Sequence, residues 1–195
     1  MALFLVLACA HAPTAPISQD GGPGAPPVPA PAPPDAIAPR PFTIDELRAG
    51  LPAGTKIRLR IRKAGEPDRE ERWSFTEADA EGCVIASTVY DATGQLVEDQ
   101  GAARASWAEL NEHATFPAAR TVREASSIDV PAGHFDTWLY TVVGTPEEGG
   151  TDFVKRYSFA RNLPGPPVQF TIVDGKGTVF EMTLIERTPM PVSPG

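Results

Sequence analysis

Few residues of this sequence combine a type and a spacing that could support catalysis. His134 and Asp136 stand two positions apart, so on a strand they would share one face, where the carboxylate could orient the imidazole as a base. No serine nucleophile motif, third ligand or HExxH pattern accompanies them. Because His134 directly follows Gly133, the alternative is a residue at the edge of a turn. We therefore expect no enzymatic activity, no metal site and no cofactor.

The two cysteines have different surroundings. Cys83 begins the apolar run Cys-Val-Ile-Ala, typical of a strand, where an unpaired cysteine usually behaves as a small buried residue. No neighbouring base or helix start would lower its pKa, so we expect it to be unreactive. Cys9 follows an uninterrupted apolar run, residues 2–8, that is too short to span a bilayer.

Two further motifs resemble binding sites for phosphate or nucleic acid. Residues 174–178, DGKGT, lack the spacing of a phosphate-binding loop and are flanked by strand-like segments, which predicts a hairpin turn. A basic row in the first predicted strand comprises Lys56, Arg58, Arg60, Arg62 and Lys63, and its three arginines would share one face of the strand. Acidic residues follow it at once, which predicts cross-strand ion pairs on a solvated face, with contact to lipid headgroups as the alternative. The formal net charge of −8 also argues against a nucleic-acid partner.

The N-terminal region differs from the rest in composition. Residues 6–9, VLAC, resemble the site at which bacterial lipoprotein signals are cut and the new N-terminal cysteine is acylated. This resemblance implies a signal peptide over residues 1–8 and a lipid such as palmitate on Cys9. Since no Lys or Arg precedes Arg40, we expect the natural start to lie upstream. Residues 9–41 hold 11 of the 22 prolines, which predicts a disordered, extended tether.

A single β-rich domain is expected over residues 42–188, followed by a flexible tail over residues 189–195. Capping boxes at Thr43 and Ser106 predict two short helices, ending near Gly50 and Ala114. Alternation of apolar and polar residues, with Gly, Pro and Asp at the turns, predicts nine strands. The first covers about residues 57–61, the second follows Asp68 and contains Trp73 and Phe75, the third covers about residues 83–90, and the fourth starts at Leu96. The remaining five lie near residues 121–130, 135–143, 153–160, 168–173 and 178–187.

Several of the late strands are apolar on both faces. Phe135, Leu139 and Val143 alternate with Trp138, Tyr140 and Val142. An antiparallel sheet with one wet face would alternate more cleanly, so the second face must be covered by helices and loops or by a curled continuation of the sheet. We therefore predict a mainly-β fold, a curved antiparallel meander or half-barrel of about nine strands with two short helices.

A family resemblance rests on residues 130–186. The segment Val130 to Asp136, VPAGHFD, is followed by a strand with aromatic residues, by YSFA and LPGPPV, and by a closing hairpin that ends EMTLIE. This pattern resembles uncharacterised bacterial envelope lipoproteins. More loosely, it is similar to the half-barrel of periplasmic lipoprotein carriers, which implies a concave face able to hold acyl chains.

Together these observations predict an envelope lipoprotein without catalytic activity, monomeric, held by its N-terminal lipid in a membrane such as the outer membrane, and facing the periplasm or the cell surface. Its domain would be a structural or interaction module that meets another envelope protein. The alternative is a carrier or binding module for an apolar or lipid-like ligand. In that case the ligand-facing residues would come from a set of six aromatic side chains: Trp73, Phe75, Trp138, Tyr140, Tyr157 and Phe159.

Overall fold

The computed structural model describes residues 36–144 and 153–189. The expected signal peptide, the lipidation site Cys9, most of the expected tether and nearly all of the C-terminal tail lie outside these ranges. The described residues form two α-helices, one 3-10 helix and nine strands. In chain order these are α1 (Ile44–Gly50), β1 (Lys56–Lys63), β2 (Arg69–Ala78), β3 (Gly82–Asp91), β4 (Leu96–Ser106), α2 (Trp107–Glu112), η1 (Ala118–Arg120), β5 (Thr121–Val130), β6 (Gly133–Val143), β7 (Phe153–Ala160), β8 (Gln169–Asp174) and β9 (Gly177–Thr188).

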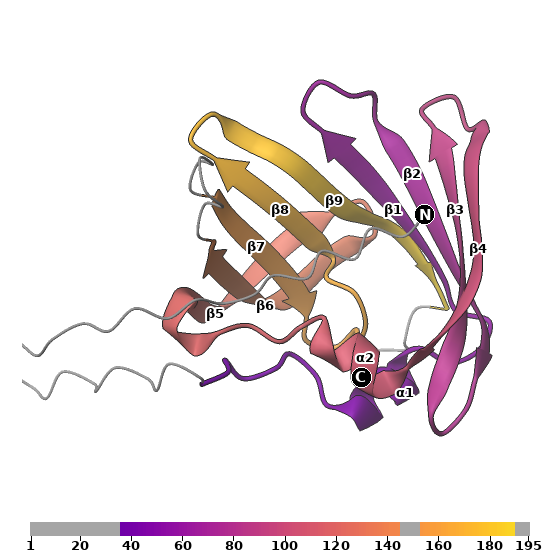
Figure 1. Ribbon diagram of the computed structural model, residues 1–195, viewed down its shortest axis with the longest axis horizontal. Coiled ribbons are helices and arrows are strands. Elements are labelled where there is room, and N and C mark those ends of the chain that lie inside the picture. Colours follow the sequence, from indigo (N-terminus) through magenta and orange to yellow (C-terminus); the bar gives the residue numbers. More distant parts are fainter. Residues whose placement is uncertain (1–35, 145–152, 190–195) are drawn as a thin grey trace, which may run out of the picture. The chain divides into compact units, whose positions relative to one another are not determined.

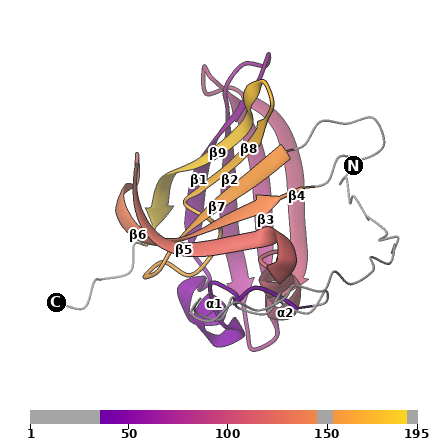
Figure 2. The same cartoon turned by 90° about the vertical axis from the view of Figure 1, so that its left-hand side faces the viewer.

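All nine strands belong to one antiparallel sheet in the order β4-β3-β2-β1-β9-β8-β7-β6-β5. The predicted mainly-β class, the number of strands and the curved antiparallel sheet are confirmed. Two meanders, β1 to β4 and β5 to β9, are joined where β1 pairs with β9, and this pairing extends from Lys56 opposite Thr188 to Lys63 opposite Phe180. The sheet stays open between its edge strands β4 and β5, and α1 and α2 lie at one end of it, between its two halves (Figures 1 and 2).

Both predicted capping boxes are present. The Thr43 hydroxyl accepts the Glu46 N–H at 3.2 Å, and the Glu46 carboxylate accepts the Thr43 N–H at 2.7 Å. Ser106 and Glu109 repeat this arrangement at the start of α2 with the same two distances. The helix α2 ends at Glu112, two residues before the predicted end. These caps allow two very short helices to begin where the chain leaves an extended segment.

The core lies on the inner face of the curved sheet. Ile57 and Leu59 on β1 are fully buried, as the alternation in this strand predicts. Trp107, the first residue of α2, is 1% exposed, and its indole N–H donates to the carbonyl oxygen of Asp79 at 2.9 Å. This bond attaches α2 to the turn between β2 and β3, so the helix is fixed over one end of the concave face.

Residues 36–42, which we call the strap, pack against the domain. The Ala38 N–H donates to the Phe116 carbonyl at 2.9 Å, and the Ala118 N–H donates to the Ala36 carbonyl at 2.8 Å. The Tyr140 hydroxyl donates to the Pro39 carbonyl at 2.6 Å. The packed chain therefore begins before the expected boundary at residue 42, and residues 36–41 do not belong to a free tether. Two apolar side chains in the strap, Ala38 and Phe42, are buried. The proline-rich composition of the segment gave no indication that it packs against the domain.

The hairpin formed by β5 and β6 explains why the late strands are apolar on both faces. Its register places Tyr140 opposite Arg123 on one face and Phe135 opposite Ile128 on the other. Phe135 is 5% exposed, although it lies on the face opposite to that of Tyr140. β5 also contacts β9, from which three strands separate it in the sheet. The curl of the sheet therefore brings distant strands together. This agrees with one of the two expected explanations, that a curled continuation of the sheet covers the second face of the late strands.

Candidate functional site

An apolar cavity of about 570 Å³ lies between the inner face of the sheet and the segments that cover it. The strap contributes Pro41 and Phe42, and α2 with the turn that follows contributes Leu110 and Ala114. The loop between β7 and β8 adds residues 165–167, of sequence GPP. A volume of this size is within the range of small-molecule binding sites.

Aromatic rings form much of the wall. Tyr157 on β7 stacks on Phe170 of β8, with the ring centres 4.5 Å apart and the planes 14° apart. Phe159, two residues further along β7, meets Phe42 of the strap edge to face at 6.1 Å. Trp73 and Phe75 line the cavity from β2. Inward positions on the neighbouring strands β7 and β8 thus place aromatic rings side by side, and β2 supplies two more from the other half of the sheet.

Four of the six aromatic residues expected to face a ligand line this cavity: Trp73, Phe75, Tyr157 and Phe159. Tyr140 and Trp138 do not line it. Tyr140 is fully buried, because its hydroxyl bonds the strap and its ring packs on Phe116 at 5.3 Å. The Trp138 ring has the guanidinium groups of Arg123 and Arg161 each 3.8 Å from its centre. Trp138 and Tyr140 lie on the same face of β6, as predicted, but other groups of the protein cover their rings.

Some lining residues escaped the sequence analysis. Phe170 and Met182 face each other across β8 and β9 on the inner face, and Ile85 lines the opposite wall from β3. Period-two alternation in these strands could have identified all three as inward-facing. Phe42 lies outside the sheet, and its approach to it depends on tertiary packing that no local pattern encodes.

The polar groups of the lining are few. None of the described residues that line the cavity is Asp, Glu, Lys or Arg. The Ser87 hydroxyl and the Trp73 indole N–H both donate to the Glu71 carboxylate, at 3.0 and 2.7 Å. The Asn111 side-chain amide donates to the Phe42 carbonyl at 3.3 Å. Burial raises the pKa of Tyr157 to about 12, so its hydroxyl stays protonated at neutral pH.

The histidine pair expected as a possible base does not form. The Nδ1 atom of His134 lies 2.8 Å from an oxygen of Asp129, its cross-strand neighbour, and Asp136 is not its partner. The side chains of His134 and Asp129 are both exposed, at 60% and 87%. The described ranges contain no group of three or more His, Cys, Asp or Glu side chains that could hold a metal ion.

The remaining sequence motifs have structural roles. Cys83 is fully buried and unpaired, and desolvation raises the pKa of its thiol. The glycine-rich segment at residues 174–178 forms the turn between β8 and β9, where the Lys176 N–H donates to the Asp174 carboxylate at 2.7 Å. The predictions of a buried thiol and of a hairpin turn are therefore confirmed.

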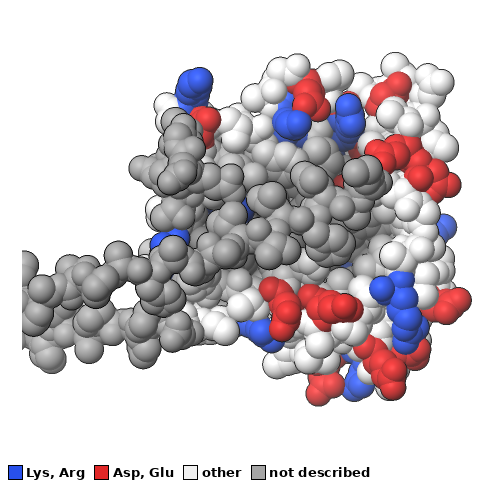
Figure 3. All heavy atoms as spheres, in the orientation of Figure 1, with Lys and Arg blue, Asp and Glu red and all other residues white. Residues whose placement is uncertain are grey.

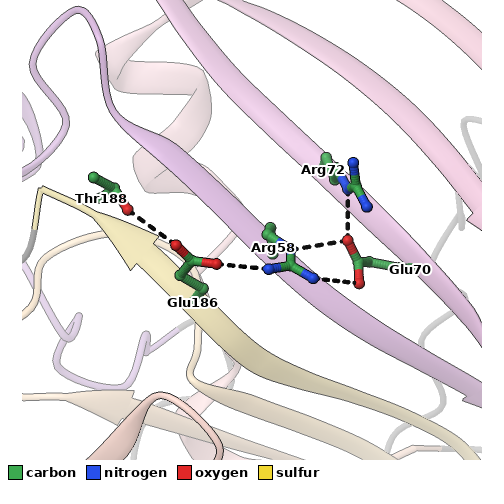
Figure 4. Close-up of polar contacts among 5 residues, drawn as sticks. All are labelled: Arg58, Glu70, Arg72, Glu186 and Thr188. Carbon is green, nitrogen blue, oxygen red and sulfur yellow. Dashed lines mark hydrogen bonds and ion pairs between the residues drawn. The ribbon is translucent and has the colours of Figure 1, made fainter. Parts of the chain in front are cut away.

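The basic row on β1 forms ion pairs with its neighbouring strands. Arg58 lies between Glu70 at 2.9 Å and Glu186 at 2.6 Å, and Arg72 also contacts Glu70 (Figure 4). The hydrogen bond from Arg58 is the main reason why the pKa of Glu70 is lowered. Basic and acidic side chains also lie beside one another at both ends of the face shown in Figure 3. The prediction of cross-strand pairs on a solvated face is confirmed.

No helix among the described residues has the length and apolar character needed to cross a membrane. No family model and no curated protein matches the chain. A Bacteroides fragilis protein assigned as exported, with a YmcC-like fold, is similar at 12% identity and a TM-score of 0.44, over 70% of this chain and 96% of that one. Hypothetical protein CT021 from Chlamydia trachomatis is similar at 9% identity and a TM-score of 0.37, over 78% and 96% of the two chains. The expected likeness to lipoprotein carriers stays a prediction.

Proposed function

We propose that this protein is a non-catalytic binding module of the bacterial cell envelope that holds an apolar or amphipathic ligand in the cavity. The cavity is the observation that carries the proposal. A scaffold that used its sheet only for packing would close such a space, because unfilled apolar volume destabilises a folded protein. Of the two functions expected from the sequence, the cavity therefore favours the binding module over the purely structural one.

The position of the cavity also supports reversible binding. His113 lines it and is an exposed residue, so the cavity reaches the protein surface near the end of α2. The segments that cover the sheet here are the strap and two short helices, α1 with seven residues and α2 with six. Short elements with few contacts open locally at a lower free energy than the central strands of a sheet. A ligand could therefore enter without disruption of the sheet.

A titration tests the binding function. The full chain, carrying Cys9→Ser to prevent lipid attachment, is titrated with the fluorescent apolar probe N-phenyl-1-naphthylamine. Ala114→Trp places a large side chain in the cavity and should reduce the probe affinity at least 10-fold. Ala119→Trp, at an exposed position outside the lining, is the matched control and should leave it unchanged.

The result that contradicts the proposal is equally definite. A dissociation constant above about 100 μM, about −5.5 kcal/mol, together with no co-purified mass in native mass spectrometry, would leave a self-packed scaffold. Equal binding by Ala114→Trp and wild type would place the probe elsewhere on the surface.

The envelope location rests on the sequence around Cys9. We propose that this cysteine carries the lipid anchor, because it ends an apolar run and begins a proline-rich segment. The gene, expressed with its upstream region in a bacterial host, should give a membrane-bound protein with an acylated N-terminal peptide. Cys9→Ser should release the protein without a change in melting temperature. An unmodified Cys9 in a soluble protein would contradict the anchor.

A further inference from the structure

We propose that the ligand is an uncharged amphipath with a hydrogen-bond acceptor, such as an ester or amide carbonyl, which the Tyr157 hydroxyl binds. This inference rests on the proposed binding function and specifies the class of ligand. It follows from two features of the cavity: the absence of Asp, Glu, Lys and Arg from its described lining, and a tyrosine hydroxyl in its wall that has no acceptor among the described residues.

The lining disfavours an anionic headgroup. No described lining residue is Lys or Arg, so a carboxylate or phosphate inside the cavity would have no permanent cation beside it. Beside Trp73, on the same inner face of β2, lies the Glu71 carboxylate, which accepts hydrogen bonds from Trp73 and Ser87 and has no ion-pair partner among the described residues. Since an unpaired ion in an apolar site is strongly destabilising, a neutral ligand is favoured.

Tyr157 is the donor that lacks a partner. Its side chain extends from the inner face of β7, and Phe170 and Phe116 flank its ring with centre distances of 4.5 and 4.8 Å. No described residue accepts a hydrogen bond from its hydroxyl, whereas the hydroxyl of Tyr140, opposite it on β6, donates to Pro39. Tyr157 is only partly buried, and its hydroxyl is not among the buried atoms that lack a partner, so it stays accessible from the cavity. A ligand that displaces water from this hydroxyl must replace the lost hydrogen bond, and an acceptor on the ligand would do so.

Among the other side-chain donors of the lining, His113 is an exposed residue at the cavity mouth, and those deeper in the wall are already used. The Ser87 hydroxyl and the Trp73 indole bond Glu71, and the Asn111 amide bonds the carbonyl of Phe42. These groups hold the wall and the strap in place. Tyr157 therefore remains as the side-chain donor inside the cavity that can distinguish a carbonyl-bearing ligand from a hydrocarbon of the same length.

Displacement of N-phenyl-1-naphthylamine from the full Cys9→Ser chain tests this inference with three matched ligands at pH 8: methyl oleate, oleate and 1-octadecene. Methyl oleate should displace the probe at a concentration at least 10-fold lower than oleate does, because its headgroup carries no charge. It should also act at a concentration about 5-fold lower than 1-octadecene, as one net hydrogen bond of about 1 kcal/mol implies.

Two variants separate the role of the hydroxyl from that of the ring. Tyr157→Phe keeps the aromatic wall and should abolish the preference for methyl oleate over 1-octadecene. Tyr140→Phe removes a hydroxyl that the protein itself uses and should leave this preference intact. Equal displacement by oleate and methyl oleate, or an unchanged preference in Tyr157→Phe, would overturn the inference and leave the binding function standing. Failure of all three ligands in a protein that binds the probe would also overturn it, whereas failure of the probe itself would contradict the proposed function.

Discussion

At the residue scale, Arg187 shows how a single side chain joins separate segments. It is 4% exposed, and its guanidinium donates to the Pro164 carbonyl at 3.0 Å and to the Gly50 carbonyl at the end of α1. Desolvation lowers its pKa to about 10, so it remains charged at neutral pH. The planar guanidinium can satisfy two carbonyls on different segments at once, which a lysine could not do in this geometry.

Gly82 is required by close packing of two strands. A Cβ at this position would overlap the carbonyl oxygen of Ala105 on β4. We expect Gly82→Ala to lower the free energy of unfolding by about 1–3 kcal/mol, as overpacking typically does. Urea denaturation measures the change. Gly175→Ala, where a Cβ would have no neighbour within 4 Å, is the control and should change the stability by less than about 0.5 kcal/mol. Equal effects would show that the strands tolerate the extra methyl group.

Cys83 should be a slow thiol. It is fully buried, and desolvation raises its pKa, so little thiolate is present and reagents cannot reach it. In the Cys9→Ser background, labelling with a disulfide reagent should be much slower in native buffer than in 6 M guanidinium chloride. Rapid labelling of the native protein would indicate that β3 opens readily or that the thiol has a redox role.

At the element scale, the strap completes the cavity. It provides Phe42 to the lining, and it gives Tyr140 and Asn111 the carbonyl groups that they bond. The same segment pairs with residues 116–118 through an isolated bridge between Ile37 and Pro117. A short irregular segment is therefore bound to the sheet, to α2 and to the turn after it.

Truncation tests the contribution of the strap. A chain that begins at Ala36 should unfold with the same midpoint as the full chain. One that begins at Phe42 lacks the buried Ala38 and the acceptor of Tyr140, and should lose about 2 kcal/mol or more, because a buried hydroxyl would be left unpaired. Thermal and urea unfolding of the two chains measure the difference. Equal midpoints would mean that residues 36–41 contribute nothing to the domain.

The turn between β2 and β3 should make the protein sensitive to acid. Asp79 pairs with Arg104 and accepts the N–H groups of Glu81 and Gly82, and these contacts lower its pKa from 3.8 to about 2, with Arg104 as the largest cause. Since the pKa is lower in the folded state, the stabilisation is complete above pH 3.8 and is lost as the pH falls through 2. In Asp79→Asn, the loss of stability between pH 4 and pH 2 should be smaller. An identical pH profile would assign that loss to other carboxylates.

Local patterns predicted the strands and helices well, and they predicted the cavity only in part. Period-two alternation assigned Trp73 and Tyr140 to inward faces, and both do face inward. Alternation cannot tell how far along a curved sheet a residue lies, or which segment covers it, so Tyr140 was grouped with residues that line the cavity. The role of Phe42 depends on contacts with β7, far away in sequence, and a proline-rich composition concealed it.

At the scale of the whole molecule, the two halves of the sheet are joined by a single pairing between β1 and β9. The common tendency of sequential strands to pair would have placed β4 beside β5. Instead β4 and β5 are the open edges, and the chain between them passes through α2 and η1. The junction buries Ile57 and Leu59 at the centre of the sheet.

Removal of β9 should therefore affect the molecule as a whole. A chain that ends at Asp174 should lose cooperative thermal unfolding and its near-UV circular dichroism, because each half would have an unpaired strand and an exposed apolar face. A chain that ends at Thr188 retains β9 and should melt as the full chain does. Cooperative melting of the chain that ends at Asp174 would show that the two halves are independent folding units.

The pairing of β1 with β9 also sets the order of events on the ribosome. β1 is the first strand to be synthesised and β9 the last, so the nascent chain cannot complete its central pairing until almost all of it has been made. Pairing of strands so distant in sequence is slow, because the closure entropy of a long loop opposes it. A chain of this design stays incompletely folded throughout translation, and this is the state in which a polypeptide can still be threaded through a membrane. The same delay leaves the edge of β1 unprotected, so a holding chaperone that binds extended chain before β9 emerges should increase the yield of folded protein.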